Sequence, residues 1–404
     1  MHPELITLFG YQIKTYGFFL MVGFLTAVWM AIRRGTRSGI DADKTLDVAF
    51  VLLISGVAGA RLFFVIHYWE SQFADRSNRL WAVLDLRQGG LEFLGGLLGA
   101  TFATIAFLVW RKQSVRLFLD LATPSVMWGL AVGRLGCFFN GCCFGAPCTT
   151  DERQTPPVAW AVQFPFGSPA HRHQWEHRQI TIPAELIVSG RDHLEPVPIP
   201  EELLRTKIEK LDGPRRRYLD AKESLDKAKS AEVDSNALKR LDEAVQAARE
   251  SLERSEREYS PLRWAQQFPS RKAPGRAMLV SELNDLAKSL RSLPVHPAQL
   301  YAAINGFILA GLLAVVYSRR KRHGVVFALL LLLYPVARMI EEVIRVDNPH
   351  DAAGLTISQL ISVLMLVTGA VAMWVLYKKL PLRSPYADAA APPPADAVPA
   401  AVTQ

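Results

Sequence analysis

Long stretches of this 404-residue chain contain almost no charged residues, although Asp, Glu, Lys and Arg make up 21% of the sequence. Length alone would allow two or three soluble domains. Apolar residues, however, come in long runs and do not alternate with polar ones, which argues against such domains. The start of the chain also lacks a basic segment followed by a small-residue cleavage site. We therefore expect the first apolar run to be retained and not removed as a signal peptide.

Seven apolar runs are candidate membrane spans, and several approach the roughly 20 residues that a helix needs to cross a hydrocarbon core of ~30 Å. They cover residues 16–34, 46–68, 91–110, 117–139, 301–318, 324–344 and 354–377. The run at 117–139 is the weakest, because it contains Asp120, Pro124 and Arg134. The sequence predicts an all-α fold, a polytopic membrane helix bundle with about seven transmembrane helices.

Basic residues follow every second predicted span. The four clusters are Arg33, Arg34 and Arg37; Arg111, Lys112 and Arg116; Arg319, Arg320, Lys321 and Arg322; and Lys378, Lys379 and Arg383. Because cytoplasmic loops carry an excess of Lys and Arg, we expect the C-terminus inside and the N-terminus and segment 140–300 outside. The net charge of +8 is then mostly a topology signal, with attraction to anionic lipid, and no nucleic-acid partner is needed to explain it.

Four regions follow from this topology. They are the first half of a transmembrane core at 1–149, an extracytoplasmic insert at 150–294, the second half of the core at 295–380 and a Pro/Ala-rich cytoplasmic tail at 381–404, which we expect to be disordered. Within the insert, apolar residues recur three and four positions apart between about 200 and 258. We predict an inserted helical hairpin of coiled-coil character there. The alternative is a charged linker that is only partly helical.

Four polar residues share one face of the sixth predicted span. Tyr334, Arg338 and Glu342 are spaced four apart, and Arg345 follows three residues later. A cation near the centre of a membrane helix costs about 2.5–3.5 kcal/mol on insertion scales, so such residues usually have a function. We predict that this face points into the bundle or into a wet cavity. The alternative is a structural Arg338–Glu342 pair, with Arg345 reaching the interface.

A second polar cluster lies where the fourth span ends, in Gly133-Arg-Leu-Gly-Cys-Phe-Phe-Asn-Gly-Cys-Cys-Phe-Gly145. Its glycines permit close backbone approach, and Asn140 supplies a donor and an acceptor. Arg134 at the depth of the membrane interface suits a lipid phosphate, which a guanidinium can bind through two parallel hydrogen bonds. The alternative is an interfacial anchor outside the site.

Four further signals are weaker when each is taken alone. Paired glycines between Gly89 and Gly99 indicate tight helix packing or a lipid-facing groove. Arg61 is another charge within a span, Tyr16 opens the first span, and His296 lies where the chain enters the fifth. His296 could act as an acid or base, or simply be an interfacial ring. Alone, each of these residues is more often structural than catalytic.

Cysteine is scarce, and the four residues Cys137, Cys142, Cys143 and Cys148 all fall in one short stretch. By the predicted topology they lie outside, where an oxidising compartment permits a disulfide. The spacing C-x4-C-C-x4-C is not a standard zinc-ligand pattern. Structural thiols, a disulfide and, as the least favoured option, a metal site stay open, and we predict no metal.

Taken together, these motifs resemble the prolipoprotein diacylglyceryl transferase family. The similarity covers about 1–145 and 294–377 and rests on seven motifs in a fixed order. They are Tyr16-Gly17, Gly59-Ala-Arg-Leu62, the Gly-Gly-x4-Gly-Gly loop from Gly89 to Gly96, Gly133-Arg134 through Asn140-Gly141 to Gly145, His296-Pro-x-Gln-Leu-Tyr301, Tyr334-x3-Arg338-x3-Glu342-x2-Arg345 and Gly354-Leu-Thr-Ile-Ser-Gln359. Each is weak alone, whereas their order on the right spans is specific.

The resemblance implies a seven-helix enzyme of the bacterial inner membrane that performs the first step of lipoprotein maturation. Such an enzyme moves the sn-1,2-diacylglyceryl group of phosphatidylglycerol to the lipobox cysteine in the signal peptide of a prolipoprotein. Glycerol 1-phosphate leaves, a thioether forms, and no cofactor is implied. By resemblance, Arg134 and Arg338 hold the phosphate, Glu342 orients a cation, and Tyr16 and Tyr334 hydrogen-bond to lipid or thiol.

We accordingly predict two groups of site residues. The catalytic group is Arg338, Glu342, Tyr16, Tyr334 and His296. The group that binds phosphatidylglycerol is Arg134, Asn140, Gly145, Arg61, Gly95, Gly96 and Arg345.

The chain departs from the family pattern at three places. Many members carry His, often proposed as functionally essential, where this chain has Leu94, so the base is left open among His296, Glu342 and Tyr16. Cys137 stands where the signature often has Asn, and the outer segment is longer than we expect for the family. The alternative functions are a related membrane enzyme with another lipid or acceptor, an inactive homologue, a transporter or channel, and a scaffold built around the hairpin.

Overall fold

The computed structural model of the chain describes most residues between positions 4 and 378. The described segments are 4–8, 11–73, 79–85, 90–148, 158–188, 197–206, 208–231, 234–256, 278–345 and 356–378. The predicted tail at 381–404, Gly89 and Gly354 lie outside them. Two compact units are present. The insert unit contains Phe138–Ala298 and Ile344–Asp347, and the helix-bundle unit contains Pro3–Cys137, Gln299–Val343 and the residues from Asn348 onward.

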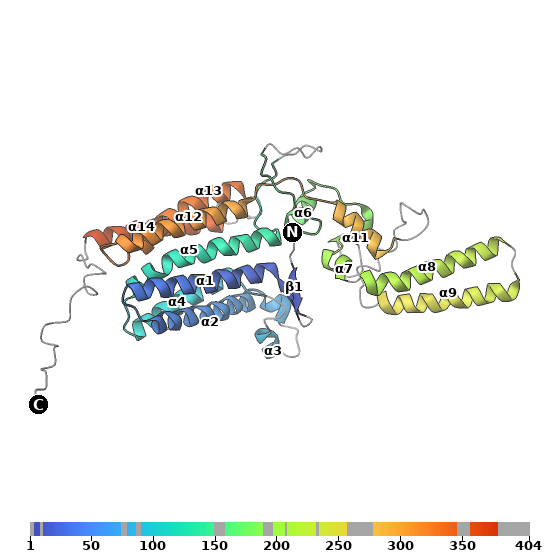
Figure 1. Cartoon of the computed structure of the whole chain (residues 1–404), viewed down its shortest axis with the longest axis horizontal. Helices are drawn as coiled ribbons and strands as arrows, with labels where there is room; N and C mark the ends of the chain where they lie inside the picture. Colours follow the sequence, from blue (N-terminus) through green and yellow to red (C-terminus); the bar gives the residue numbers. More distant parts are fainter. Residues whose placement is uncertain are drawn as a thin grey trace, which may run out of the picture. The chain divides into compact units, whose positions relative to one another are not determined.

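Seven long helices overlap the seven predicted spans (Figure 1). They are α1 (Thr15–Arg37), α2 (Ala42–His67), α4 (Phe93–Trp110), α5 (Val115–Asn140), α12 (Ala298–Arg319), α13 (Val325–Ile344) and α14 (Ile357–Lys378). Within the described segments, six of them are long and apolar enough to cross a membrane. The other, α13, carries Arg338, Glu341 and Glu342, which make it less apolar. The predicted all-α, multi-pass membrane bundle is confirmed.

The backbones of α2 and α4 touch through glycines, and Figure 1 shows the two helices side by side. A Cβ added at Gly59 would lie 2.5 Å from the carbonyl oxygen of Gly95, and one added at Gly99 would lie 2.8 Å from that of Ser55. A Cβ at Gly95 would lie 2.4 Å from the Cβ of Phe63. Tight packing, one of the two interpretations of the paired glycines, is therefore present between α2 and α4.

Small residues also stand at other helix contacts in the bundle. The pairs are Gly23 of α1 with Gly129 of α5, Gly306 of α12 with Ala131 of α5, and Gly369 of α14 with Leu331 of α13. At the first contact, the indole N–H of Trp128 donates to the hydroxyl of Thr26 at 3.0 Å. The helix contacts thus run from α4 through α2, α1, α5 and α12, with α13 against α14.

A buried ion pair ties α5 to the connection between α12 and α13. The side chains of Asp120 and Arg320 are both fully buried, with 3.3 Å between Oδ2 and Nε. Asp120 also accepts the backbone N–H groups of Gly324 at 2.7 Å and Phe327 at 2.9 Å, where α13 begins. The guanidinium of Arg320 stacks 3.4 Å from the ring centre of Tyr317. Arg320, which belongs to the basic cluster that follows the fifth predicted span, is therefore a buried structural cation.

The insert unit contains helices and two short strands around its own apolar core. They are α6 (Pro169–Glu176), a 3-10 helix η2 (Ala184–Leu186), β3 (Ile187–Val188), β4 (Val197–Pro198), α7 (Glu201–Thr206), α8 (Ile208–Ser230), α9 (Ser235–Glu256) and α11 (Val280–Ser289). β3 and β4 pair antiparallel, with Ile187 opposite Pro198. Fully buried residues of the core include Leu186, Ile199, Leu204, Leu211, Val280 and Leu283.

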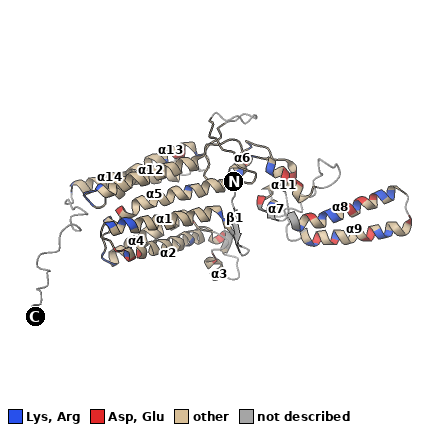
Figure 2. Cartoon of the chain, in the orientation of Figure 1, with Lys and Arg blue, Asp and Glu red and all other residues tan. Residues whose placement is uncertain are grey.

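The predicted helical hairpin is present as α8 and α9, which lie antiparallel (Figure 1). Figure 2 shows charges of both signs along its two helices. The carboxylate of Asp212, near the start of α8, accepts the backbone N–H groups of Val280 at 2.7 Å and Ser281 at 3.0 Å. Those residues open α11, and Leu211 belongs to the same core. The hairpin is therefore fixed to the insert unit and is not a charged linker.

Four short elements near the ends of α1 and α2 were not predicted. β1 (Glu4–Leu8) and β2 (Tyr11–Lys14) pair antiparallel immediately before α1. A π-helical turn η1 (Trp69–Phe73) and α3 (Arg79–Leu84) follow α2.

Replacing Gly95 by Ala should loosen the contact between α2 and α4. Its Cβ has no room, and overpacking of this kind costs roughly 1–3 kcal/mol. Gly311→Ala in α12 is the matched control, because a Cβ there meets nothing within 4 Å. We expect thermal unfolding in detergent to show a lower Tm for Gly95→Ala and an unchanged or higher Tm for Gly311→Ala. Equal Tm values for the two variants would contradict the packing.

Acid should destabilise the insert unit through His171. Its side chain is only 2% exposed, and burial lowers its pKa from 6.5 to about 4. As pH falls below 6.5 the unfolded chain binds a proton that the folded chain does not, so stability is lost, by up to about 3 kcal/mol near pH 4. Hydrogen exchange in α6 and α11 at pH 7 and pH 4.5, corrected for intrinsic rates, measures this loss. His171→Gln should reduce it, whereas His177→Gln at an exposed position should not.

Candidate active site

The central feature of the helix-bundle unit is a buried ion pair on α13. Arg338 is 8% exposed and Glu342 is 5% exposed. The Nη2 atom of Arg338 lies 2.7 Å from Oε2 of Glu342, one helical turn along. The same nitrogen donates to the hydroxyl of Ser358 on α14 at 2.9 Å. The predicted inward-facing polar face of α13 is thus present for Arg338 and Glu342. Arg345 is not part of it, because α13 ends at Ile344 and Arg345 belongs to the insert unit.

Glu342 is in turn fixed by the N-terminus of α14. The hydroxyl of Thr356 donates to Oε1 of Glu342 at 2.6 Å. Thr356 also accepts the backbone N–H of Gln359 at 3.2 Å, while the side chain of Gln359 accepts the backbone N–H of Thr356 at 3.0 Å. This reciprocal capping box holds the Thr356 hydroxyl in place. The carboxylate therefore has a fixed position from which it can orient Arg338.

A second carboxylate lies further from the guanidinium. Oε2 of Glu341 is 3.8 Å from Nη1 of Arg338, which is an ion-pair distance but too long for a hydrogen bond. The amide of Asn305 on α12 donates to the other oxygen of Glu341 at 3.4 Å. Arg338 thus faces two carboxylates, and its immediate surroundings carry no excess of positive charge.

One donor group of Arg338 is left over. In the described part of the chain, its buried Nη1 atom has no hydrogen-bond acceptor. Leaving a buried donor unsatisfied costs about 1–3 kcal/mol, and more for a charged group. The arrangement suits a ligand oxygen, above all an anionic one, which would form a charge-assisted bond.

Tyr334 lies one turn before Arg338 on the same helix. Its half-buried ring packs against the largest apolar cluster of the bundle, which includes Leu330 and Leu313. The structure therefore places Tyr334, Arg338 and Glu342 in one row on α13, as their spacing predicted.

Arg134 and Tyr16 lie on two helices that touch. A Cβ added at Gly136 of α5 would meet the backbone oxygen of Tyr16 at 3.3 Å and the Cβ of Phe19 at 3.0 Å. Arg134 is half-buried and precedes Gly136 by two residues, while Tyr16 at the start of α1 is exposed. The missing Cβ at Gly136 thus lets the ends of α1 and α5 approach closely.

Arg61 on α2 has a different environment from the one we expected. Its Nε donates to the carbonyl of Val83 at 2.7 Å, and its Nη2 donates to those of Ala82 at 2.7 Å and Asp85 at 3.0 Å. Its Nη1 donates to the carbonyl of Gly90 at 3.0 Å. The guanidinium thus holds α3 and the start of the glycine loop by their backbones. These contacts favour a positioning role over direct contact with lipid.

The predicted lipid-binding glycines Gly95 and Gly96 lie in the first turn of α4 and face α2. A Cβ added at Gly96 would lie 3.2 Å from the carbonyl oxygen of Gly56. Leu94, beside them, has a side chain that is 38% exposed. The two glycines therefore serve helix packing, and only Leu94 of the three presents a side chain outward.

Three predicted site residues come together within the insert unit through their backbones. The N–H of Gly145 donates to the carbonyl of His296 at 2.9 Å, and Gly145 forms a β-bridge with Arg345. A Cβ at Gly145 would lie 2.8 Å from both the Cβ and the carbonyl oxygen of His296. Only glycine fits here, and this explains the last glycine of the signature. Asn140, the last residue of α5, is half-buried in the same unit.

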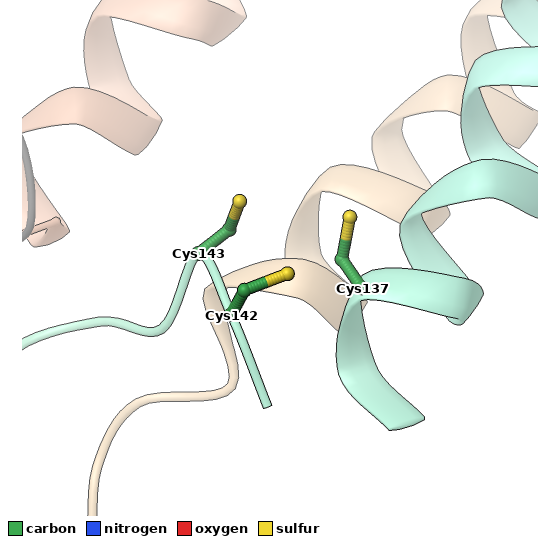
Figure 3. A group of neighbouring side chains, drawn as sticks. All are labelled: Cys137, Cys142 and Cys143. Carbon is green, nitrogen blue, oxygen red and sulfur yellow. The ribbon is translucent and has the colours of Figure 1, made fainter. Parts of the chain in front are cut away.

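The thiols at the end of α5 also converge. Figure 3 shows Cys137 in the last turns of the helix and Cys142 and Cys143 just beyond it. Their three sulfur atoms lie within 4.8 Å of one another. Since α5 is continuous and the three residues span seven positions of chain, this geometry is local. All four cysteines are present as thiols, and burial raises the pKa of Cys148.

Sequence reasoning missed the partners of the ion pair. Ser358 and Thr356 lie in the last of the seven motifs, but nothing in its spacing pairs them with α13. A threonine followed three residues later by glutamine is a capping-box signal, and it could have placed Thr356 at a helix start. Asn305 and Glu341 gave no comparable signal.

Fold and site together define a multi-pass membrane protein whose helix bundle holds a buried Arg–Glu pair with one unused donor. The family model for prolipoprotein diacylglyceryl transferase matches residues 3–197 and 258–375. The chain therefore belongs to the prolipoprotein diacylglyceryl transferase family.

Curated relatives agree with this assignment. The chain is 37% identical over 166 residues to a protein of Rhodopirellula baltica, covering 41% of this chain and 32% of the relative. It is 36% identical over 173 residues to one of Photobacterium profundum, covering 42% and 61%, and 35% identical over 135 residues to one of Bacillus cereus, covering 33% and 48%. All three bear the name phosphatidylglycerol--prolipoprotein diacylglyceryl transferase. The chain thus spans less than two thirds of the length of each.

Removing Glu342 should destabilise the bundle more than removing an exposed glutamate. Breaking a buried pair leaves an uncompensated charge and costs roughly 3–5 kcal/mol, whereas an exposed pair contributes at most about 1 kcal/mol. Glu253, which pairs with Arg249 on the surface of α9, provides the control. We expect a large drop in Tm in detergent for Glu342→Ala and almost none for Glu253→Ala. Similar drops would show that the Arg338 charge is compensated by another group.

Proposed function

We propose that this chain transfers the sn-1,2-diacylglyceryl group of phosphatidylglycerol to the lipobox cysteine in the signal peptide of lipoprotein precursors. The observation that carries the proposal is the unused, buried Nη1 donor of Arg338 inside a membrane bundle. Family membership and the printed names of the relatives supply the reaction class. Glycerol 1-phosphate is the leaving group, and the product is a thioether.

The chemistry explains why a buried arginine would be needed. As the bond between the glyceryl carbon and the phosphate oxygen breaks, negative charge grows on that oxygen. A guanidinium that binds more tightly as charge grows lowers the barrier. Arg338 supplies this group from α13, and Arg134 supplies a second cation from α5. Glu342 and Ser358 act through Arg338 by fixing its plane.

The other predicted residues keep narrower proposed roles. Tyr16 and Tyr334 would hydrogen-bond to lipid or thiol. The phosphatidylglycerol site would be lined by Arg345, Asn140 and Gly145. Its shape would depend on Arg61, Gly95 and Gly96, which hold neighbouring backbone segments in place. His296 is a candidate base.

The proposed setting is the bacterial inner membrane. The basic residues at the C-terminal ends of α1, α4 and α14 favour a cytoplasmic C-terminus, with the N-terminus and the insert unit outside. The predicted regions 1–149, 150–294, 295–380 and 381–404 keep their proposed boundaries.

Expression in a strain depleted of its own transferase tests the function. Wild type should convert a lipobox precursor to a thioether-linked diacylglyceryl form, seen by gel shift and intact mass. Arg338→Lys should lower the rate by roughly 100-fold, as for loss of one donor to a developing oxyanion. Arg33→Lys, near the exposed end of α1, should act like wild type. Membrane levels of each variant are measured in parallel.

Two results would favour a function other than the proposed transfer. If well-expressed wild type is inactive but Leu94→His is active, the chain is a degenerate homologue. If neither is active, the enzyme uses another lipid or acceptor.

A further inference from the structure

The three thiols at the end of α5 form a compact cluster that the proposed function does not use. Cys137 is buried, and Cys142 and Cys143 are half-buried. The chain reverses just after the helix, because Gly141 and Cys143 both adopt left-handed backbone angles, with φ of 75° and 58°. Figure 3 shows that this reversal brings the later two side chains back toward Cys137.

Three converging thiols are a ligand set for a soft metal ion. Zinc bonds to thiolate sulfur at about 2.3 Å, so sulfur atoms on one tetrahedral zinc lie about 3.8 Å apart. Sulfur atoms already within 4.8 Å of one another need to move only slightly to reach that spacing. Three protein ligands leave a fourth position open, which is the pattern of catalytic rather than structural zinc sites.

We propose that Cys137, Cys142 and Cys143 bind Zn²⁺ and that the open position receives the acceptor thiol of the lipoprotein precursor. The second part rests on the proposed transferase function. The site also gives a role to Cys137, which replaces a frequent Asn of the family signature. The site would also replace the base that many family members could draw from the His at the position of Leu94. A thiol that coordinates zinc is deprotonated outright and needs no separate base.

The reaction step then balances as follows. The precursor thiol loses its proton to water on binding the metal. Its sulfur attacks the sn-3 carbon of the diacylglyceryl group, forming a C–S bond. The C–O bond to phosphate breaks, and its electron pair leaves on the oxygen of glycerol 1-phosphate. No electrons enter or leave overall, and no oxidant is required.

The placement of the cluster on α5 fits this step. Cys137 follows Arg134 by three residues, so both lie on one face of the helix. Arg134, the proposed phosphate ligand, would thus stand one turn from the activated sulfur. The positive charge of Arg134 would also offset the net negative charge of a zinc ion bound by four thiolates.

Cobalt tests the metal site without reference to activity. Purified, reduced full-length protein in detergent is titrated with Co²⁺ under anaerobic conditions. We expect a thiolate-to-cobalt charge-transfer band that saturates at one ion per chain, and at least tenfold weaker binding in Cys137→Ser, Cys142→Ser and Cys143→Ser. Cys148→Ser, whose sulfur lies outside the cluster, should bind like wild type. No band, equal binding in all variants, or a Cys137 disulfide that persists in the purified protein would overturn the site.

Two further experiments test whether the metal activates the acceptor thiol of the precursor. A lipobox peptide with cysteine should change the cobalt band, whereas the same peptide with serine should not; identical spectra would overturn the open-position role. Zinc removal should reduce transfer by wild type at least tenfold, and Zn²⁺ should restore it. Undiminished transfer after removal contradicts the inference but leaves the proposed function standing. Absence of transfer under all conditions contradicts the proposed function, while the cobalt titration still decides the metal site.

Discussion

The burial of the Arg338 charge is the interaction on which the site depends. A guanidinium within a membrane bundle is stable only if carboxylates and hydroxyls surround it, and α13 and α14 provide Glu342, Ser358 and Thr356 at hydrogen-bond distances. The capping box of α14 fixes Thr356, Thr356 fixes Glu342, and Glu342 fixes the arginine. Each contact thus restricts the orientation of the next, and the result is a cation whose plane is set before any ligand arrives.

The other buried cations of the bundle show what distinguishes this one. Arg61 directs every donor nitrogen to backbone carbonyls, and Arg320 is paired with Asp120 and stacked on Tyr317. These contacts connect α2 to α3 and α5 to α13, so both arginines hold the fold together. Among the described residues, the Nη1 donor of Arg338 lacks an acceptor. Within the described segments, Arg320 also has donor atoms without acceptors, Nε and Nη2, but its side chain is fully buried, whereas that of Arg338 is 9% exposed. The unused donor of Arg338, together with the partial exposure of its side chain, therefore points to a ligand.

Local periodicity predicted the parts of this molecule that depend on neighbouring residues in sequence. The seven apolar runs gave the long helices, and the four-residue spacing gave the polar face of α13. Contacts between distant segments could not be read this way. Ser358 lies 20 positions from Arg338, and Arg61 meets carbonyls 21 to 29 positions away. The close contact of Gly95 with Phe63 on α2 likewise joins distant segments, and the sequence does not show it.

The most direct test of the account measures lipid binding rather than transfer. Native mass spectrometry of wild type and Arg338→Lys, titrated with phosphatidylglycerol in detergent, compares the two affinities. Arg319→Lys at the end of α12 serves as a control. The account predicts at least about tenfold weaker binding for Arg338→Lys, since a lysine cannot reproduce the fixed fork of donors and one hydrogen bond to a charged group is worth about 1.5–3 kcal/mol. Equal affinities for wild type and Arg338→Lys would contradict it.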